Sequence, residues 1–458
     1  MKKIFQYIML AVVTIVMASC TSDIEETTTT AGKSNVQLVV GEFPAFGDSQ
    51  TRAIGTPDEG KTSWAKGDEL LLEMTSKTLG TKYAAFTYNG SSWELTSGEL
   101  SYKEDEVPTF PHVYYAPNYK WEAGKLVLKE GKVEGTDEYI EGKANITPNG
   151  EAITVKFAEA TRKYSRLRIA TMPNKPITVA ISIYSPAGSS DMKWDQNYAL
   201  TSDEKGNAYL YGTFENNSEV TVKYREAALT TYTFSQATES AKSYALDATV
   251  ISANSAEEIK SAIKQEVADG KTAIRLNLAS DAGDNEFNAI REAFEKVKSG
   301  TIDLTLIGCK EIPADGLNNQ SGGLEALKSI TLPDVTKIGK YALLFCVDLE
   351  EICAPNVSAI DEGAFAECLK LRKVTLGELT DVKGDYEHGD GIFGLDSYSI
   401  ENIDLELSEK QRIMTRKLID GRYCWTPTEV PYQMSDDHKN RSFLGMTFKS
   451  ITCGMKFQ

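Results

Sequence analysis

The sequence has few of the residues that build catalytic and metal sites. Its three histidines, His112, His388 and His438, form no HExxH pair and no Ser/His arrangement with local support. The seven cysteines include no CxxC pair, which argues against a zinc knuckle or a redox motif. The runs GTPDEGKT at 55–62 and GDGIFG at 389–394 match the GxxxxGK[ST] and GxGxxG patterns. The first lies in a region without a helical period and the second between repeat units, so neither has the strand–loop–helix context that a phosphate site needs. We therefore predict a non-enzymatic protein with no catalytic residues, no metal site and no cofactor.

Positive charge is also scarce. The chain has 49 Lys and Arg against 66 Asp and Glu, a formal net charge of −17. Phosphate backbones repel such a chain, so we expect no nucleic-acid partner. The 458 residues are enough for several domains, each of which can bury its own core.

A long hydrophobic run occurs only at the N-terminus. Lys2 and Lys3 precede an apolar run over residues 4–18, which as a helix spans about 22 Å and is too short to cross a membrane comfortably. Ala18 and Ser19 then stand directly before Cys20, which is the lipobox arrangement. We predict that residues 1–19 are a signal peptide and that Cys20 carries the acyl chains, palmitate among them, that attach the protein to a membrane. An ordinary signal peptide with an incidental cysteine is the alternative.

Residues 20–33 are expected to be a solvated tether. Asp23, Glu25 and Glu26 are followed by a threonine run over residues 27–30, a composition that cannot pack a core. The acidic patch behind Cys20 resembles the surface-export signal of lipoproteins from Gram-negative gut and oral anaerobes. This resemblance implies a lipid-anchored protein of the outer membrane that is displayed on the cell surface. A plain spacer on the inner leaflet is the alternative.

Residues 34–252 alternate short apolar strands with turn residues and show no helical period. The pair Asn89 and Gly90, between apolar runs at 83–88 and 92–95, predicts a hairpin because both residues tolerate positive φ. The pattern predicts two all-β sandwiches in tandem, over residues 34–147 and 148–252, divided at the turn that begins with Pro148.

This region resembles the fimbrillin-like family of pilins and pilus-associated proteins. The resemblance is carried by TRA at 51–53, WAKGD at 64–68, YNGSSW at 88–93, VYYAP at 113–117, TVKF at 154–157 and YTF at 232–234. It implies transthyretin-like sandwiches and pilus subunits as possible partners. It also implies that an arginine-specific protease processes the chain at Arg52. Trp64, Trp93 and Tyr115 are expected to be core aromatics rather than ligand-binding residues.

Residues 253–322 have the pattern of an αβαβ cap. Ser255 and Glu258 are the ends of a capping box, and Ile259, Ile263 and Val267 follow at helical spacing. A strand at 274–278, a second amphipathic helix at 287–297 and a strand at 302–307 are then expected.

Residues 323–458 are expected to form a leucine-rich-repeat domain, because the sequence repeats with a period of 22 from Leu324. Leu327, Leu349 and Leu371 align at this period, and the neighbouring apolar positions follow it. A fourth unit is expected at a spacing of 29 through Ile400, Ile403 and Leu405. Such a repeat predicts an α/β leucine-rich-repeat solenoid in which each turn buries the apolar edge of its neighbour.

The runs 332–352 and 354–374, with LPDVTKIGKYA and a later cysteine, resemble the BspA-like class of bacterial leucine-rich repeats. That class is associated with surface adhesion and host-protein binding, so the resemblance implies a host or bacterial surface protein as partner. Cys346 and Cys368, one turn apart, are expected to be small buried hydrophobes, with a disulfide as the alternative. The loop around residues 385–390 could hold a cation, but a solvated loop is favoured because EF-hand spacing is lacking.

The side chains between the inward positions of the repeat strands should form one exposed polar face. This candidate binding face consists of Ser329, Thr331, Glu351, Cys353, Lys373, Thr375, Asn402 and Asp404. Its mixed polar character suits a protein surface better than a nucleic acid or a stacked sugar chain, and a merely solvated face is the alternative.

Three function classes remain: an adhesin, a pilus component or fimbrial anchor, and a glycan-hydrolysing surface enzyme. We predict a non-enzymatic adhesin in which a β-sandwich stalk presents the repeat module, with the pilus component as the alternative. The enzyme is disfavoured because the sequence singles out no exposed carboxylate pair.

Overall fold

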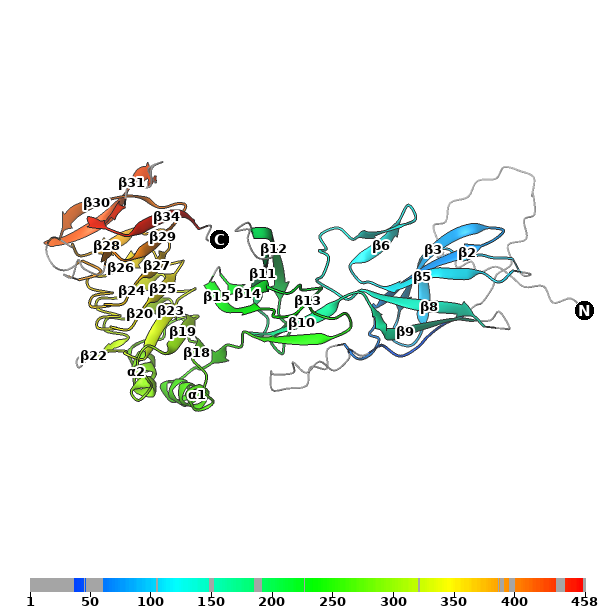
Figure 1. The fold of residues 1–458 in the computed structure, drawn as a ribbon, viewed down its shortest axis with the longest axis horizontal. Helices are drawn as coiled ribbons and strands as arrows, with labels where there is room; N and C mark the ends of the chain where they lie inside the picture. Colours follow the sequence, from blue (N-terminus) through cyan, green and yellow to red (C-terminus); the bar gives the residue numbers. More distant parts are fainter. Residues whose placement is uncertain are drawn as a thin grey trace, which may run out of the picture.

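The computed structural model describes residues 37–44, 46, 61–103, 106–147, 152–184, 192–225, 227–319, 322–385, 387, 391–394, 400–433 and 441–455. Cys20, Arg52, the predicted signal peptide and the tether lie outside these residues. The described chain is mostly strands and forms three units in a row along its longest axis (Figure 1). This confirms the predicted β-rich multidomain architecture.

The first unit is built on one seven-stranded sheet in the order β1-β9-β8-β5-β2-β3-β4. Strand β1 lies parallel to β9, and the remaining neighbours are antiparallel. A small hairpin of β6 (Tyr119–Glu122) and β7 (Lys125–Leu128) stands beside it. The sheet strands are β1 (Gln37–Val40), β2 (Glu69–Ser76), β3 (Gly80–Tyr88), β4 (Trp93–Gly98), β5 (Thr109–Tyr115), β8 (Ile140–Ile146) and β9 (Ala152–Arg162).

The predicted hairpin and the core aromatics are both present in this unit. Gly90 has φ +107°, and Asn89 Oδ1 accepts the backbone N–H of Ser91 and of Ser92 at 2.8 Å. Trp64 packs edge-on against Trp93 and Tyr115, at centroid distances of 5.3 and 5.2 Å. Its indole N–H donates to the Gly41 carbonyl at 2.7 Å, which ties the N-terminal segment to this cluster.

The predicted boundary at residues 147/148 requires a correction. Strand β9 begins at Ala152 but pairs with β1 and β8, and its Ile153 and Val155 belong to the first core. The first unit therefore continues to Arg162, because β9 forms its ladder hydrogen bonds with two strands of the first sheet.

The second unit is a sandwich of two sheets, in the orders β13-β10-β16 and β12-β11-β14-β15. The alternation of buried and half-buried residues along β14 turns Val220 and Val222 toward the shared core. The strands are β10 (Ser165–Ala170), β11 (Pro176–Tyr184), β12 (Met192–Thr201), β13 (Asn207–Gly212), β14 (Ser218–Tyr224), β15 (Ala227–Thr233) and β16 (Ser243–Asp247).

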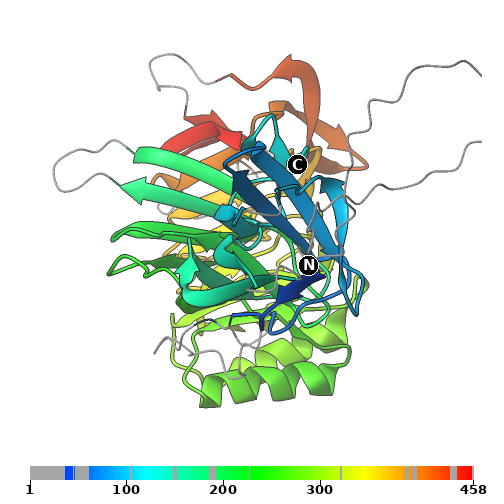
Figure 2. The same ribbon diagram turned by 90° about the vertical axis from the view of Figure 1, so that its right-hand side faces the viewer.

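The third unit begins with the predicted αβαβ pattern and continues into the repeats. Ser255 is the N-cap of α1 (Ala256–Ala268), and its side chain accepts the backbone N–H of Glu258. Helices α1 and α2 (Asp284–Phe294) lie at one end of the unit and its C-terminal strands at the other (Figures 1 and 2). A parallel sheet of eight strands runs between these ends: β17 (Ile251–Ser252), β18 (Ala273–Asn277), β19 (Ile302–Ile307), β23 (Leu327–Thr331), β25 (Glu351–Ala354), β27 (Lys373–Leu376), β29 (Asp404–Ser408) and β34 (Ser450–Met455).

A second ladder lies in the same unit, in the order β20-β24-β26-β28-β31-β30. Its first four strands are parallel and one repeat apart, and the β30–β31 hairpin closes it antiparallel. The strands are β20 (Glu311–Ile312), β24 (Lys337–Ile338), β26 (Ala359–Ile360), β28 (Asp381–Lys383), β30 (Arg412–Ile419) and β31 (Arg422–Pro431), with two further small pairs, β21 (Asn318–Asn319) with β22 (Gly322–Gly323) and β32 (Ser442–Phe443) with β33 (Met446–Thr447).

The period of 22 is confirmed in the strand register, and the predicted spacing of 29 is wrong by two. Glu351 lies opposite Lys373, 22 residues on, but Lys373 lies opposite Asp404, and 404 − 373 = 31. Leu405, rather than Ile403, therefore takes the place of Val374. A shift of two residues along a strand keeps the same side chains inward, so the apolar pattern could not distinguish the two registers.

The second and third units meet in a packed joint. One apolar core runs through the third unit from Ala253 to Ile451, whereas Ile307 at the end of β19 packs into the core of the second unit. The buried carboxylate of Asp334 accepts the Gly308 backbone N–H at 3.0 Å and pairs with Arg225 of the second unit at 2.9 Å. This joint should restrict relative motion of the two units.

Candidate binding surfaces

The predicted polar face lies along the repeat strands, but its members are not all where the sequence placed them. Strand pairing aligns Ser329 with Glu351 and Thr331 with Cys353, and all four are partly exposed. Lys373 and Thr375 continue these two rows, yet Thr375 is only 2% exposed. Its hydroxyl donates to Glu406 at 2.7 Å.

Two positions of that face change with the corrected register. Asp404 lies opposite Lys373, and Glu406 lies opposite Thr375. Asn402 stands in the turn before β29 and is not a member of the strand face. The predicted face therefore loses Asn402 and gains Glu406.

Ion pairs between turns neutralise most charges on and beside this face. Arg372 pairs with Glu350 at 2.6 Å and with Glu351 at 3.3 Å, and Lys373 pairs with Glu406 at 3.3 Å. Such exposed pairs contribute little to stability, but they leave the face without a strong field of either sign.

Burial raises the pKa of all six cysteine thiols in the described part of the third unit. Burial raises the pKa of the Cys353 thiol to about 11, so it stays protonated at neutral pH and is a poor nucleophile. Cys346 and Cys368 are buried, and the Cys368 thiol points to the Leu343 carbonyl at 3.3 Å. None of the six cysteines in the described chain forms a disulfide. The burial of Cys346 and Cys368 confirms that these two are small buried hydrophobes.

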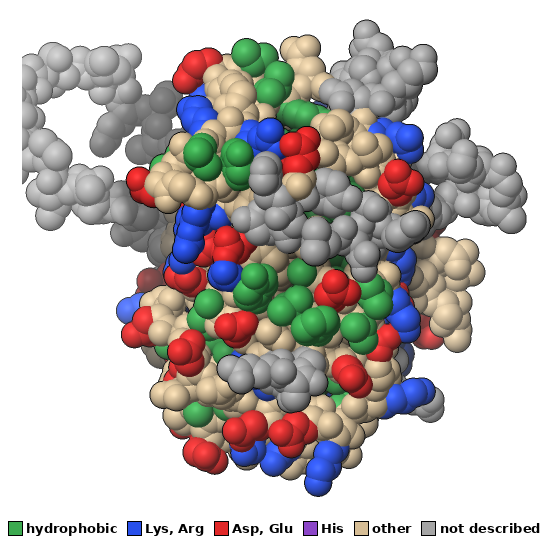
Figure 3. All heavy atoms as spheres, turned by 90° about the vertical axis from the view of Figure 1, so that its left-hand side faces the viewer, with side chains coloured by type: hydrophobic (Ala, Val, Ile, Leu, Met, Phe, Trp, Pro, Cys, Tyr) green, Lys and Arg blue, Asp and Glu red, His purple; other side chains and the backbone are tan. Residues whose placement is uncertain are grey.

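A second surface of the repeats exposes large apolar side chains, and the sequence reasoning missed it. Phe345 is 44% exposed and Leu369 55% exposed, on the turns that lead from one repeat strand to the next. We call the stacked turns 341–347 and 363–369 the loop edge. Figure 3 shows hydrophobic side chains gathered among acidic ones on the side of the repeats that faces away from the second unit.

The backbone holds the loop edge in a fixed conformation. The Phe345 N–H donates to the Ala366 carbonyl at 3.1 Å, which links the two turns. Phe345 has φ +60°, a left-handed conformation that costs a bulky residue about 1–2 kcal/mol. Gly323 lets the chain fit there, because a Cβ at this position would lie 2.2 Å from the Phe345 carbonyl carbon. The sequence did contain a signal for this surface: Leu344 and Phe345 are apolar residues at positions of the repeat that do not point into the core.

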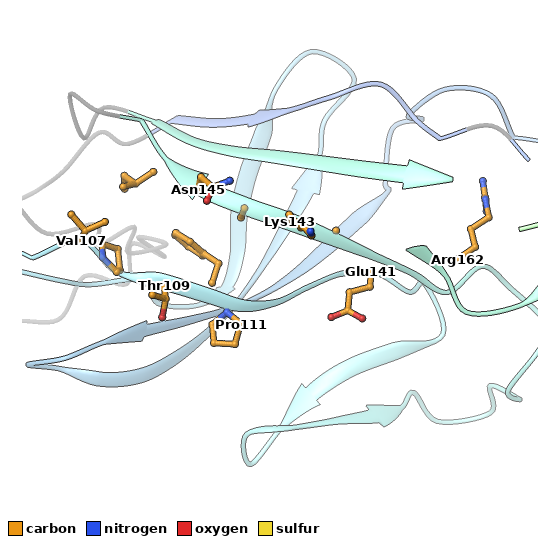
Figure 4. A pocket seen from close by; sticks show the side chains of 12 residues that line it. Val107, Thr109, Pro111, Glu141, Lys143, Asn145 and Arg162 are labelled. Atoms are coloured by element: carbon orange, nitrogen blue, oxygen red, sulfur yellow. The ribbon is translucent and has the colours of Figure 1, made fainter. Parts of the chain in front are cut away.

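A groove opens in the first unit where β5 and β8 separate. The two strands pair only at Val113–Tyr115 with Ile140–Gly142, and toward Thr109 and Ile146 they leave a space of about 830 Å³ (Figure 4). Pro108 and Pro111 offer no amide hydrogen on the β5 side. Any added strand would therefore pair mainly with β8.

A buried ion pair lies at the other end of this groove. Arg162 pairs with Glu138, and its guanidinium carbon stands 3.7 Å from the centre of the Phe46 ring. Arg166 approaches the same ring at 4.1 Å. Both arginines thus hold the N-terminal segment between the first and second units. Burial raises the pKa of Glu138 to about 7, and this effect outweighs the attraction of Arg162.

The pKa of Glu138 predicts a pH-dependent stability of the first unit. The folded value of about 7 lies above the ordinary value of 4.5, so the folded chain binds this proton more tightly than the unfolded chain. Stability gained by protonation is present at low pH and is lost as the pH rises through 7. We expect urea unfolding to show the unit less stable at pH 8 than at pH 5.5, by on the order of 2 kcal/mol. Glu138→Gln should flatten this difference, and an unchanged difference in that variant would rule Glu138 out as its source.

No candidate cation site remains in the part of the loop around residues 385–390 that the structure describes. Arg416 pairs with Asp385 at 2.7 Å and with Glu387 at 2.6 Å, so one guanidinium binds both carboxylates. Among the described residues, no group of three or more histidines, cysteines or carboxylates could hold a metal ion. His388 lies outside the described residues.

The family comparison agrees with the repeat geometry. Residues 319–389 match the model of the BspA type leucine rich repeat region, in 6 copies. The leucine-rich repeat prediction is confirmed over these residues. The match covers well under half of the chain, and the fimbrillin-like resemblance of the N-terminal region has no corresponding match.

Two further comparisons add little. A crystal structure titled "putative cell adhesion protein", from Bacteroides fragilis, is similar at 11% identity with a TM-score of 0.27, over 47% of this chain and 93% of that chain. No curated protein matches the chain. Within the described ranges, no helix is both long and apolar enough to cross a membrane.

Proposed function

We propose that this chain is a cell-surface lipoprotein that acts as a non-enzymatic adhesin. Lipidated Cys20 anchors it in the outer membrane, the first two units act as a stalk, and the leucine-rich repeats of the third unit bind a host or bacterial surface protein. The two-sheet arrangement of the second unit supports a transthyretin-like, fimbrillin-like stalk.

The order of the units is the observation that carries this proposal. The first, second and third units follow one another along the longest axis, with the leucine-rich repeats at the end opposite the first unit (Figure 1). An anchor ahead of the first unit would hold the repeats far from the membrane. The packed joint at Ile307 and Asp334 would keep the repeat domain extended from the stalk.

Within the leucine-rich repeats, the loop edge is the better candidate for the contact surface. Interfaces depend on a few desolvated apolar or aromatic anchors surrounded by polar residues. Phe345 and Leu369 offer such anchors, whereas the charges of the strand face are already paired with one another. The strand face of Ser329, Glu351 and Lys373 remains the second candidate.

The identity of the partner can be tested with the purified mature chain. Binding of this chain to immobilised extracellular-matrix proteins and to glycan arrays is measured. A Phe345→Ser/Leu369→Ser variant and a Glu351→Lys/Lys373→Glu variant are measured in parallel. We expect the first variant to lose binding at least tenfold, because each buried apolar anchor contributes more than about 1 kcal/mol. Loss only in the second variant would move the contact to the strand face, and failure of the wild-type chain to bind any matrix protein or glycan would contradict the proposal.

A pilus component is the second candidate function, and the groove between β5 and β8 favours it. The β8 edge near Asn145 and Ile146 is unpaired with β5 and could accept a strand of another subunit. Processing at Arg52 would be part of that route. Treatment with an arginine-specific protease should then produce oligomers that an Arg52→Ala variant does not form, and continued monomer behaviour in both would reject this function.

A further inference from the structure

A small pocket lies where the first unit meets the second. It has a volume of about 220 Å³ and lies between the two sheets of the second unit, under the segment that contains Glu134 and Gly135. The Gly135 carbonyl accepts the Tyr211 backbone N–H at 2.7 Å, which fixes this segment over β13. The lining residues used below are Glu134, Tyr164, Gln196, Tyr198, Phe214 and Ser218.

The Ser218 side chain is an unused hydrogen-bonding group in this pocket. Ser218 is 0% exposed, and its hydroxyl has no partner among the described residues. Its backbone is satisfied, because its N–H donates to the Glu215 carbonyl at 3.0 Å and its carbonyl accepts the Phe234 N–H at 2.9 Å. A buried hydroxyl is costly to leave unpaired, so this position calls for a ligand atom or a water.

Glu134 supplies a charged acceptor at the pocket. Its carboxylate accepts the Tyr164 hydroxyl and pairs with Lys163 at 3.1 Å. The hydrogen bond from Tyr164 is the main cause that lowers the pKa of Glu134, so the group is ionised at neutral pH. Burial and the same carboxylate raise the pKa of Tyr198, which keeps that hydroxyl protonated as a donor.

The chemistry of these groups narrows the class of ligand. An anion would be repelled by Glu134, and a purely apolar ligand would leave the Ser218 hydroxyl unpaired. Hydroxyl groups can donate to Glu134 and exchange hydrogen bonds with Ser218 and the Gln196 amide. The rings of Tyr198 and Phe214 provide apolar surface for the C–H groups of a ring.

We propose that this pocket binds a single neutral sugar residue. A pocket of about 220 Å³ has room for one sugar ring. The proposal does not rest on the binding of a protein by the leucine-rich repeats. It adds a second, independent site on the stalk, built by both units at their junction.

The test is titration of the purified mature chain with neutral monosaccharides, namely glucose, galactose, mannose, fucose and N-acetylglucosamine, followed by saturation-transfer NMR and calorimetry. We expect at least one of them to bind saturably. Ser218→Ala should weaken that binding roughly three- to tenfold, the fold-change of one lost hydrogen bond. The same variant should leave the melting temperature unchanged or raised, because the hydroxyl has no protein partner to lose.

A second variant guards against a folding defect. Glu134 is exposed, so Glu134→Gln should not disturb the fold. It should weaken sugar binding tenfold or more, since it removes a charged acceptor. Glu122→Gln, an exposed carboxylate paired with Lys120, is the matched control and should bind as the wild type does. The proposal is overturned if no sugar binds at concentrations up to about 100 mM, where even weak sites fill. It is also overturned if an anionic sugar binds as well as the neutral ones, or if neither pocket variant changes the affinity.

Discussion

Leu349→Ala is expected to lower the free energy of unfolding of the third unit by about 2–5 kcal/mol. Leu349 is fully buried, one repeat away from Leu327 and from Leu371 in the single core of this unit. Removing its side chain leaves a cavity that the neighbouring turns cannot close, because their strands are fixed on both sides. Native-state hydrogen exchange at the amides of the repeat strands β23, β25 and β27 measures the change, since these strands carry side chains of that core.

A matched variant in the first unit controls for a general effect. Leu72→Ala removes an equally buried leucine from the first core and should leave the hydrogen exchange of the repeat strands unchanged. The first unit should likewise be untouched by Leu349→Ala. We expect the second unit to respond in part, because Ile307 of the third unit packs into the second core. If Leu349→Ala lowered the free energy of unfolding of the first unit by the same amount as that of the third unit, the two cores would not be independent.

Cys20→Ala is expected to move nearly all of the protein from the membrane fraction to the soluble fraction. The acyl chains on Cys20 are the proposed attachment, and each buried CH₂ contributes about 0.8 kcal/mol to it. Metabolic palmitate labelling and cell fractionation measure this loss. Cys353→Ala is the matched control and should keep both the label and the membrane location, since its thiol lies within the repeats. Palmitate that persisted in the Cys20→Ala protein would contradict the assignment.

The repeats could be predicted from the sequence because each turn contacts only its neighbours. A period of 22 in apolar residues translates directly into strand register, as Ser329, Glu351 and Lys373 show. After residue 383 the next repeat is longer, and Ile403, Leu405 and Leu407 alternate so regularly that a slip of two residues was invisible. That slip alone placed Asn402 on the strand face in place of Glu406.

The first domain boundary could not be predicted because it depends on long-range pairing. Strand β9 alternates as any sandwich strand does, and its pairing with β1 (Gln37–Val40) and with β8 assigns it to the first unit. A turn signal at Pro148 marks a loop between strands, and a loop need not divide two domains. The joint through Ile307 was equally hidden, since a buried isoleucine at a strand end does not reveal which core receives it.

The candidate surfaces differ in how much the sequence revealed. The strand face could be predicted because inward and outward residues alternate along each repeat strand. The ion pairs that neutralise it could not be predicted, because they depend on the distance between neighbouring turns. The loop edge was missed because Phe345 occupies a left-handed turn position that carries no repeat signal. The Ser218 pocket was missed because Glu134 and Ser218 come from different units and meet only in the folded chain.

Adhesion of intact cells tests the central claim most directly. Cells that display the wild-type chain or the Phe345→Ser/Leu369→Ser variant are first labelled with an antibody to the first unit, so that display is equal. Their attachment to immobilised extracellular-matrix proteins is then counted. We predict that intact wild-type cells are labelled and attach, and that the variant cells are labelled equally but attach at least tenfold less, through the loss of two apolar anchors. Cells that bind no antibody until they are lysed, or equal attachment of both proteins with loss only on deletion of residues 37–252, would contradict the account.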